Sequence, residues 1–230
     1  MKGHLKDLWL NLLRSLDDIK ETVRNAAKEA VKALESLSLR LCDPLQSAQT
    51  SADALSIILP LLLSHGLTSK AESVVAMSMS LVHKIAKSAG KMLIPHVPEL
   101  SRLILEGMAS FEPSMLNYLS FHNEKMGITQ SEMEKIRLEG MASSPLSSTL
   151  DLCLGHVTKE NIDLLISNTS SLLTKGVGMQ TRVATARFVT RLSETSFELL
   201  KPLAPKLLNS LQISLLDNSP SVRKAYGQKI

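Results

Sequence analysis

Apolar residues recur at steps of three and four along most of the chain, the spacing that places them on one face of an α-helix. At the start, this pattern predicts a helix over 5–16 and a second helix over 23–41, separated by a turn at 17–18. The second helix is predicted to end near Pro44, because proline disfavours the helical conformation of the residue before it. The predicted core faces are Leu5, Leu8, Trp9, Leu12, Leu13 and Leu16 in the first helix and Val23, Ala27, Ala30, Leu34, Leu37 and Leu41 in the second.

The same layout returns near the other end of the chain. Leucines at helical spacing over 203–215 predict one helix, and the next begins at Val222. Between them, Asp217-Asn218-Ser219-Pro220 predicts a turn, with Ser219 as the N-cap and Pro220 at the first helical position. The chain therefore carries a helix-turn-helix unit at both ends.

An Asp in the turn and an Arg in the second helix mark the repeat. Asp18 and Arg24 of the first unit stand at the same offsets as Asp217 and Arg223 of the last, and Arg182 marks a weaker third copy. Arg223 follows Arg182 by 41 residues, and Arg182 follows Arg24 by 158 residues, close to four such steps. A period of this length is typical of helical-repeat arrays.

The units between these copies are less regular. The pattern predicts a helix kinked at Pro60, a capping box over 69–72, and helices that begin at Pro98 and Pro113. After a predicted loop over 122–127, the motif Thr129-x-x-Glu132 favours the start of a charged helix. The regular pattern resumes at Ile162.

The whole pattern predicts an all-α fold, an α-solenoid of about five helix-turn-helix repeats with an irregular insertion. We expect repeats 1–3 over residues 1–121, an insertion or linker with a charged helix over 122–146, and repeats 4–5 over 147–230. The last repeat is expected to be truncated, since its second helix has room for only a few turns.

Composition agrees with helices and limits the partners. Apolar residues make up 44% of the chain, but only one Trp, two Tyr and four Phe are present, which disfavours a β-sandwich. The net charge is +4, and basic residues alternate with acidic ones, so no nucleic acid is expected as a partner. The longest apolar run, Leu55–Leu63, is too short to cross a bilayer, and no signal peptide is visible at the start. We therefore expect a soluble intracellular chain without direct membrane insertion.

No motif points to catalysis, a metal or a cofactor. The six histidines lack the spacing of a metal-binding helix, and Cys42 and Cys153 are predicted to be buried thiols rather than a disulfide framework. The glycines at 176 and 178 lie between helices, so they do not form a phosphate-binding loop after a strand. The chain is predicted not to be an enzyme; an enzyme with an unrecognised site remains an alternative that a measured turnover would revive.

Two sets of charged residues are candidates for a role in the array. The turn aspartates and helix arginines are predicted to pair in a structural Asp–Arg ladder, through bidentate bonds from guanidinium to carboxylate. Its members are Asp18, Arg24, Arg182, Asp217 and Arg223. A partner surface is predicted at basic residues that lie off the apolar faces, namely Lys28, Lys32, Arg187 and Arg191. The competing hypothesis places the contact in the insertion at 122–146, because irregular segments often carry recognition.

The repeats resemble HEAT repeats, and five segments in order resemble one family of very long HEAT-repeat chains, the large proteasome adaptors and scaffolds. The segments are LRSLDDIKETVRNAAKEAVKAL (13–34), FEPSMLNYLSFH (111–122), MASSPLSSTLDLCLGHV (141–157), LLTKGVGMQTRVATARFVTRL (172–192) and LLDNSPSVRKAYG (215–227). The resemblance is weakest over 123–140 and stops at both ends.

This resemblance implies a non-enzymatic scaffold that binds the regulatory and core particles of the proteasome. It also implies roles in proteasome assembly, protein quality control and endoplasmic-reticulum-associated degradation, with trafficking or membrane-compartment adaptors as further partners. The expected location is cytoplasmic and nuclear, and peripheral to the endoplasmic reticulum and endosomes. An alternative is a HEAT-repeat transport receptor or adaptor of the nuclear-import type, which a Ran-like GTPase in a pull-down would favour.

Overall fold

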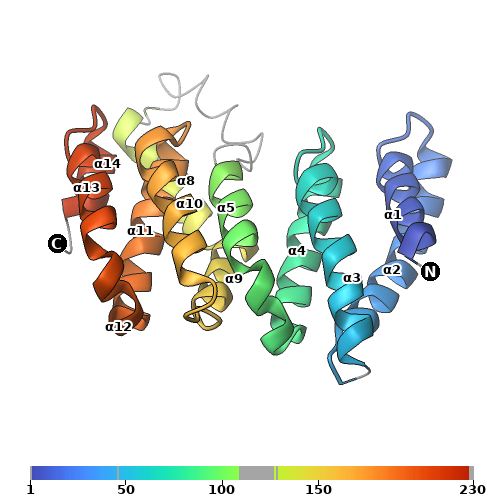
Figure 1. Cartoon of the computed structure of the whole chain (residues 1–230). Coiled ribbons are helices and arrows are strands. Elements are labelled where there is room, and N and C mark those ends of the chain that lie inside the picture. The colour runs from blue at the N-terminus through green and yellow to red at the C-terminus, as the bar shows by residue number, and fades with distance from the viewer. Residues whose placement is uncertain (1, 46, 109–126, 128, 228–230) are drawn as a thin grey trace. The chain divides into compact units, whose positions relative to one another are not determined.

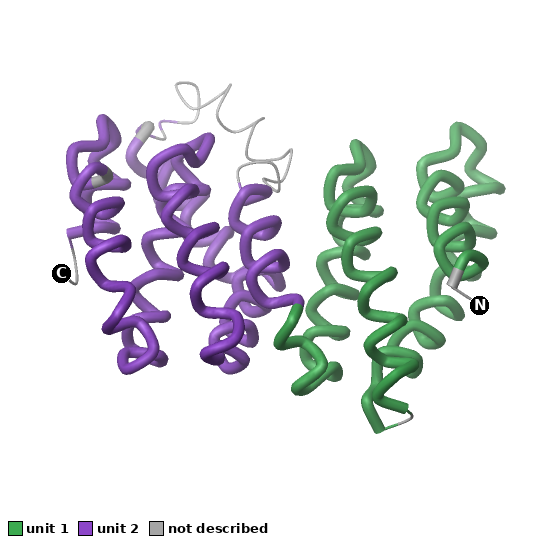
Figure 2. The backbone as a smooth tube through the Cα atoms, in the orientation of Figure 1, with its two compact units in different colours: residues 1–95 green, residues 96–230 purple. Residues whose placement is uncertain are grey.

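Helices account for the regular secondary structure of the described residues, as the sequence pattern predicts, and these residues contain no strand. The computed structural model describes residues 2–45, 47–108, 127 and 129–227 (Figure 1). The chain forms two compact units, residues 1–95 and 96–230 (Figure 2). The repeat boundaries predicted at 121 and 146 stay predictions, since a division into compact units does not test them.

The first unit contains two pairs of helices. Helix α1 (Lys2–Leu16) packs against α2 (Glu21–Cys42), and α3 (Ala48–Leu61), with a π-helical turn at Leu62–Gly66, packs with α4 (Glu72–Ser88). Helix α1 also packs against α3, and α2 against α4, so the pairs stack in two layers. A 3-10 helix, η2 (Gly90–His96), follows α4.

The core of the first unit is centred on the indole of Trp9, which is fully buried. Its Nε1–H donates to the Ser38 hydroxyl at 3.1 Å, so the polar atoms of both side chains are satisfied in the interior. The predicted face of α2 is partly wrong. Ala27 and Leu34 are buried as expected, but Leu37 is exposed and Ser38 takes the inward position.

One local prediction in the first unit is borne out in part and another is corrected. Helix α3 contains Pro60, which has no N–H to donate, and the chain then widens into the π turn; the kink predicted at Pro60 stays a prediction. The capping box predicted over 69–72 is not formed. The N-cap of α4 is Ala71, which makes no side-chain cap bond, and the Ser69 hydroxyl accepts from the N–H of Ala71 at 3.2 Å.

The second unit contains the remaining helices. They are α5 (Val97–Gly107), α8 (Gln130–Ala142), α9 (Pro145–Leu154), α10 (Ile162–Lys175), α11 (Met179–Thr195), α12 (Phe197–Leu200), the 3-10 helix η3 (Lys201–Leu203), α13 (Ala204–Ser214) and α14 (Pro220–Gly227). The helix predicted to begin at Pro113 and nearly all of the loop predicted over 122–127 lie outside the described residues.

The second unit has two layers of helices and one helix outside them. Helix α10 packs between α5 and α13 in the first layer, and α11 packs against α9 and α14 in the second. Helix α9 also packs against α5, so among the described helices it is a second-layer partner of α5. Helix α8 packs on α11 from the side away from the first layer.

The two cysteines are buried, Cys42 in the first unit and Cys153 in the second. Burial raises the pKa of each thiol to about 12. Because the thiolate is the reactive form, we expect iodoacetamide at pH 8 to label both cysteines only in proportion to the unfolded fraction of the chain. Mass spectrometry of the protein labelled with and without urea checks this, and rapid labelling of the folded chain would contradict it.

Candidate functional site

Helix α8 begins at a complete capping box. The Thr129 N–H and hydroxyl donate to the Glu132 carboxylate at 2.8 and 2.7 Å, and the Glu132 N–H donates to the Thr129 hydroxyl at 3.2 Å. These bonds, the backbone one first, lower the pKa of Glu132. The sequence motif is therefore confirmed as a helix start. Most of the α8 side chains that follow are exposed or half-buried, and Met133 alone among those described is buried.

Helix α11 provides the central surface of the site. A turn with Gly178 at φ +85° precedes it, a conformation that residues with a Cβ rarely adopt. A Cβ on Gly176 would also collide with the Leu172 carbonyl oxygen. This turn precedes α11, which buries Phe188 and Leu192 and leaves Arg187 and Arg191 exposed.

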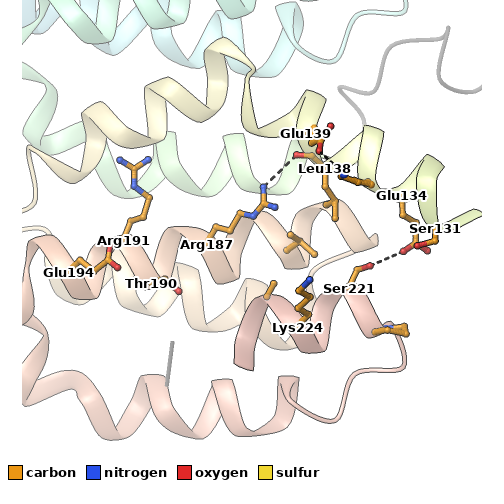
Figure 3. Close-up of a pocket in the computed structure, with 14 residues that line it drawn as sticks. Ser131, Glu134, Leu138, Glu139, Arg187, Thr190, Arg191, Glu194, Ser221 and Lys224 are labelled. Carbon is orange, nitrogen blue, oxygen red and sulfur yellow. Dashed lines mark hydrogen bonds and ion pairs between the residues drawn. The ribbon is translucent and has the colours of Figure 1, made fainter. Parts of the chain in front are cut away.

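Helix α14 lies beside α11 and begins as the sequence predicts. The Ser219 hydroxyl accepts from the Val222 N–H at 3.4 Å, and Pro220 occupies the first helical position. Val222 and Tyr226 are buried, and the Tyr226 hydroxyl donates to the Arg182 carbonyl oxygen of α11 at 3.4 Å. Helix α14 therefore presents Ser221 and Lys224 at its edge with α8 (Figure 3).

Helices α8, α11 and α14 enclose a cleft of about 690 Å³, which we call the α8 groove (Figure 3). Its walls combine charged side chains with apolar ones. They consist of Ser131, Glu134, Lys135, Leu138 and Glu139 from α8, Val183, Arg187, Thr190, Arg191 and Glu194 from α11, and Pro220, Ser221, Lys224 and Ala225 from α14.

Polar contacts join the walls of the groove. The Ser221 hydroxyl donates to a Glu134 carboxylate oxygen at 2.8 Å, and Arg187 Nη1 donates to the Leu138 carbonyl oxygen at 3.5 Å (Figure 3). Arg191 pairs with Asp151 of α9. Within the described ranges, Lys224 has no carboxylate partner, so the α14 edge offers an unpaired positive charge.

The predicted partner surface is divided between the two units. Lys28 and Lys32 lie on the exposed side of α2 in the first unit, where Lys32 pairs with Glu29 at 2.7 Å. Arg187 and Arg191 line the α8 groove in the second unit. The groove thus brings two of the four predicted residues beside helix α8. This helix lies in the insertion, which the competing hypothesis names as the contact. Sequence reasoning missed Glu134, Ser221 and Lys224, because their proximity depends on how α8 packs.

The Asp–Arg residues form a different arrangement from the predicted one. Arg24 Nη1 donates to the carbonyl oxygens of Asp18 and Ile19, both at 2.8 Å, and Arg223 makes the equivalent bonds to Asp217 and Asn218 at 2.7 and 3.0 Å. The two turn carboxylates instead accept backbone N–H groups two residues on, at 2.8 Å in both turns. Within a turn, therefore, Arg holds the backbone and not the carboxylate.

One predicted pair does link neighbouring repeats. Arg182 Nε of α11 lies 2.8 Å from an Asp217 carboxylate oxygen in the turn before α14, and the two side chains are 28% and 13% exposed. Arg182 Nη1 also donates to the Gly176 carbonyl oxygen of its own turn at 3.4 Å. The Asp217 carboxylate thus accepts a hydrogen bond within its own turn and pairs with an arginine of the adjacent repeat.

The described residues contain no group of three or more His, Cys, Asp or Glu residues that could hold a metal ion. Over the described ranges, each helix is too short or too polar to cross a membrane. The groove combines paired and unpaired charges with apolar side chains.

Comparison with known proteins assigns the chain to a family. Residues 93–230 match the family model described as "Proteasome adapter and scaffold protein ECM29, HEAT-repeat domain". The chain is 34% identical over 221 residues to the proteasome adapter and scaffold protein ECM29 of Homo sapiens, which covers 96% of the chain and 12% of that protein. It is 28% identical over 235 residues to proteasome component ecm29 of Schizosaccharomyces pombe, covering 99% of the chain and 14% of that protein.

A third relative, proteasome component ECM29 of Saccharomyces cerevisiae, is 26% identical over 223 residues, with 96% of the chain and 12% of that protein covered. The chain thus spans about one eighth of the length of these relatives. None of the three is named as a transport receptor. Since the family model covers more than half of the chain, this chain belongs to the ECM29 family of HEAT-repeat proteasome adapter and scaffold proteins.

Proposed function

We propose that this chain is a non-enzymatic scaffold segment that binds the proteasome, and that the α8 groove is its contact surface. The observation that carries the proposal is the meeting of Arg187 and Arg191 with helix α8 in one cleft. This meeting supports a contact that combines two of the four predicted basic residues with helix α8 of the insertion.

The physical argument rests on the composition of the groove. Its unpaired Lys224 and the exposed guanidinium of Arg187 favour a carboxylate of the partner, while the carboxylates of α8 favour a basic group. Charges placed beside apolar side chains select the register in which a partner binds more than they add affinity. Many such contacts along a long scaffold sum to tight binding of a large assembly.

We further propose that the scaffold contacts both regulatory and core particles and supports proteasome assembly and protein quality control, including endoplasmic-reticulum-associated degradation. In this proposal the protein is cytoplasmic and nuclear, and trafficking or membrane-compartment adaptors bring it to the periphery of the endoplasmic reticulum and endosomes. The names of the relatives and the family match support the proteasome as the partner class.

Paired charge reversals test the groove as the contact. R187E/R191E is expected to lower the amount of purified proteasome that the immobilised chain retains at low salt by about tenfold, because it inverts the charge of one wall. K28E/K32E makes the same change in net charge on an exposed face of the other unit, and it should lower retention less than about twofold.

Folding of both variants is checked by circular dichroism, since R187E/R191E also removes the ion pair with Asp151. Unchanged retention by a folded R187E/R191E variant would exclude the groove as the contact. Equal losses in the two variants would mean that the chain attracts the proteasome by net charge alone. Retention of a Ran-like GTPase instead of proteasome subunits would support a transport receptor.

A further inference from the structure

Helix α8 is held on the second unit by few buried contacts. Among its described side chains, Met133 alone is buried, at 3% exposed, and Ile136 is 40% exposed. The neighbouring α10 has a similar length, 14 residues against 13, but buries seven side chains. Burial of apolar side chains supplies most of the free energy that holds a helix on its unit. We therefore infer that α8 is anchored far more weakly than α10.

Two polar contacts of α8 with other helices lie at the groove, the hydrogen bonds from Ser221 to Glu134 and from Arg187 to the Leu138 carbonyl oxygen. The first bond is part-buried and the second is exposed. The ion pair between Lys135 and Glu139 is 3.9 Å long, lies within α8, and joins side chains that are 76% and 67% exposed. Exposed contacts such as the second bond and this ion pair contribute little net stability.

Helix α8 depends on docking for its helical state. An isolated helix of about 12–15 residues is marginal in water even when its sequence favours helix formation. Helix α8 has 13 residues, and its capping box satisfies only its first turn. Release of α8 from α11 would therefore also melt α8, which makes amide exchange a direct measure of release.

The C-terminal end of α8 lines a cavity of about 190 Å³ with a mixed lining. Its apolar part includes Met141 of α8 and four side chains from other elements, Met108, Leu150, Ala184 and Phe188. Asp151, Arg187 and Arg191 add charged groups to the same lining. The four apolar side chains from other elements are at most 6% exposed while α8 is in place.

We propose that α8 is a detachable cover of the second helical layer, which on release opens the α8 groove and exposes the apolar side chains beneath it. Release of α8 depends only on the contacts of α8 within this chain. The proposal is therefore independent of whether the groove binds the proteasome. Release of the helix widens the groove, which combines apolar and charged side chains, without unfolding α10 or α11.

Hydrogen–deuterium exchange of the full 230-residue chain tests the cover directly. Peptides from α8 are expected to exchange at least about tenfold faster than peptides from α10 and α11, because α8 opens without the rest of its unit. Exchange of α8 as slow as that of α10 and α11 would overturn the proposal.

Met133→Ala removes the one buried anchor and is expected to speed the exchange of α8 by about a further tenfold, while α10 is unchanged. Ile136→Ala is the matched control on the same helix, and it should change α8 exchange less than about threefold. Binding of the dye 8-anilinonaphthalene-1-sulfonate should rise in Met133→Ala and stay at the wild-type level in Ile136→Ala.

A second variant acts on the other wall of the groove. Ser221→Asp places a carboxylate against Glu134, so it replaces the hydrogen bond with repulsion and should also speed α8 exchange. If either folded variant speeds exchange of α10 and α11 as much as that of α8, α8 is an integral part of the unit and the proposal fails. Faster α8 exchange with unchanged proteasome retention would keep the cover and count against the groove as the contact.

Discussion

Replacing Trp9 with alanine is expected to lower the free energy of unfolding of the unit 1–95 by about 3–5 kcal/mol. The indole is fully buried between paired helices, so its loss leaves a cavity that the packed helices fill only in part. The change also leaves the buried Ser38 hydroxyl without its donor, which adds the cost of an unsatisfied polar group. Urea unfolding followed by circular dichroism measures the loss.

The control for this change lies one residue away. Leu8 is 51% exposed on the same helix, and Leu8→Ala should cost less than about 1 kcal/mol. Hydrogen exchange assigns the loss to the correct unit, since α1–α4 should exchange faster in Trp9→Ala and α10 should not. Equal losses in the two variants would show that α1 is not part of a cooperative core.

The sequence pattern predicts the helices of the array well, because each depends on local signals. The apolar spacing of residues 5–16 predicts α1, the turn before Val222 predicts the start of α14, and Thr129 with Glu132 forms the predicted capping box. Spacing, caps and turns act within a few residues, so a single sequence contains them.

The exact face that a helix buries is less well predicted. In α2 the periodic reading favours Leu37, but the structure exposes it and buries Ser38 and Cys42. The reason is a long-range contact, since the Ser38 hydroxyl satisfies the indole of Trp9 from another helix. A polar residue that is buried because it accepts a hydrogen bond from a buried donor cannot be identified from the spacing of apolar residues.

The site depends on packing that no local signal contains. Arg187 and Arg191 are recognisable as residues off the apolar face of α11, and α8 as a charged helix in an irregular segment. Their meeting follows from the packing of α8 on α11 and from the bond between Glu134 and Ser221, 87 residues apart. The sequence therefore suggests the basic residues and the insertion as alternatives, while the fold brings two of the four basic residues, Arg187 and Arg191, beside helix α8 of the insertion.

The Asp–Arg motif shows the same limit. Its period identifies a repeated turn, but the spacing alone does not distinguish an Arg that holds turn carbonyl groups from an Arg that pairs with a carboxylate. Arg24 and Arg223 do the first, and Arg182 does the second with the Asp217 of the next repeat. The choice is set by whether a following repeat places a carboxylate within reach.

Asp217→Ala is therefore expected to cost about 3 kcal/mol in the stability of residues 96–230, because it leaves the half-buried Arg182 without its carboxylate partner and also removes the turn bond to the Ser219 N–H. Asp18→Ala is the matched control: it removes the same kind of turn bond, to the Lys20 N–H, and should cost only about 1 kcal/mol. Urea unfolding of both variants, and of Arg182→Ala with and without Asp217→Ala, gives the coupling between the two side chains. Equal costs for Asp217→Ala and Asp18→Ala, with no coupling to Arg182, would mean that the Asp–Arg motif stabilises single turns and does not fasten one repeat to the next.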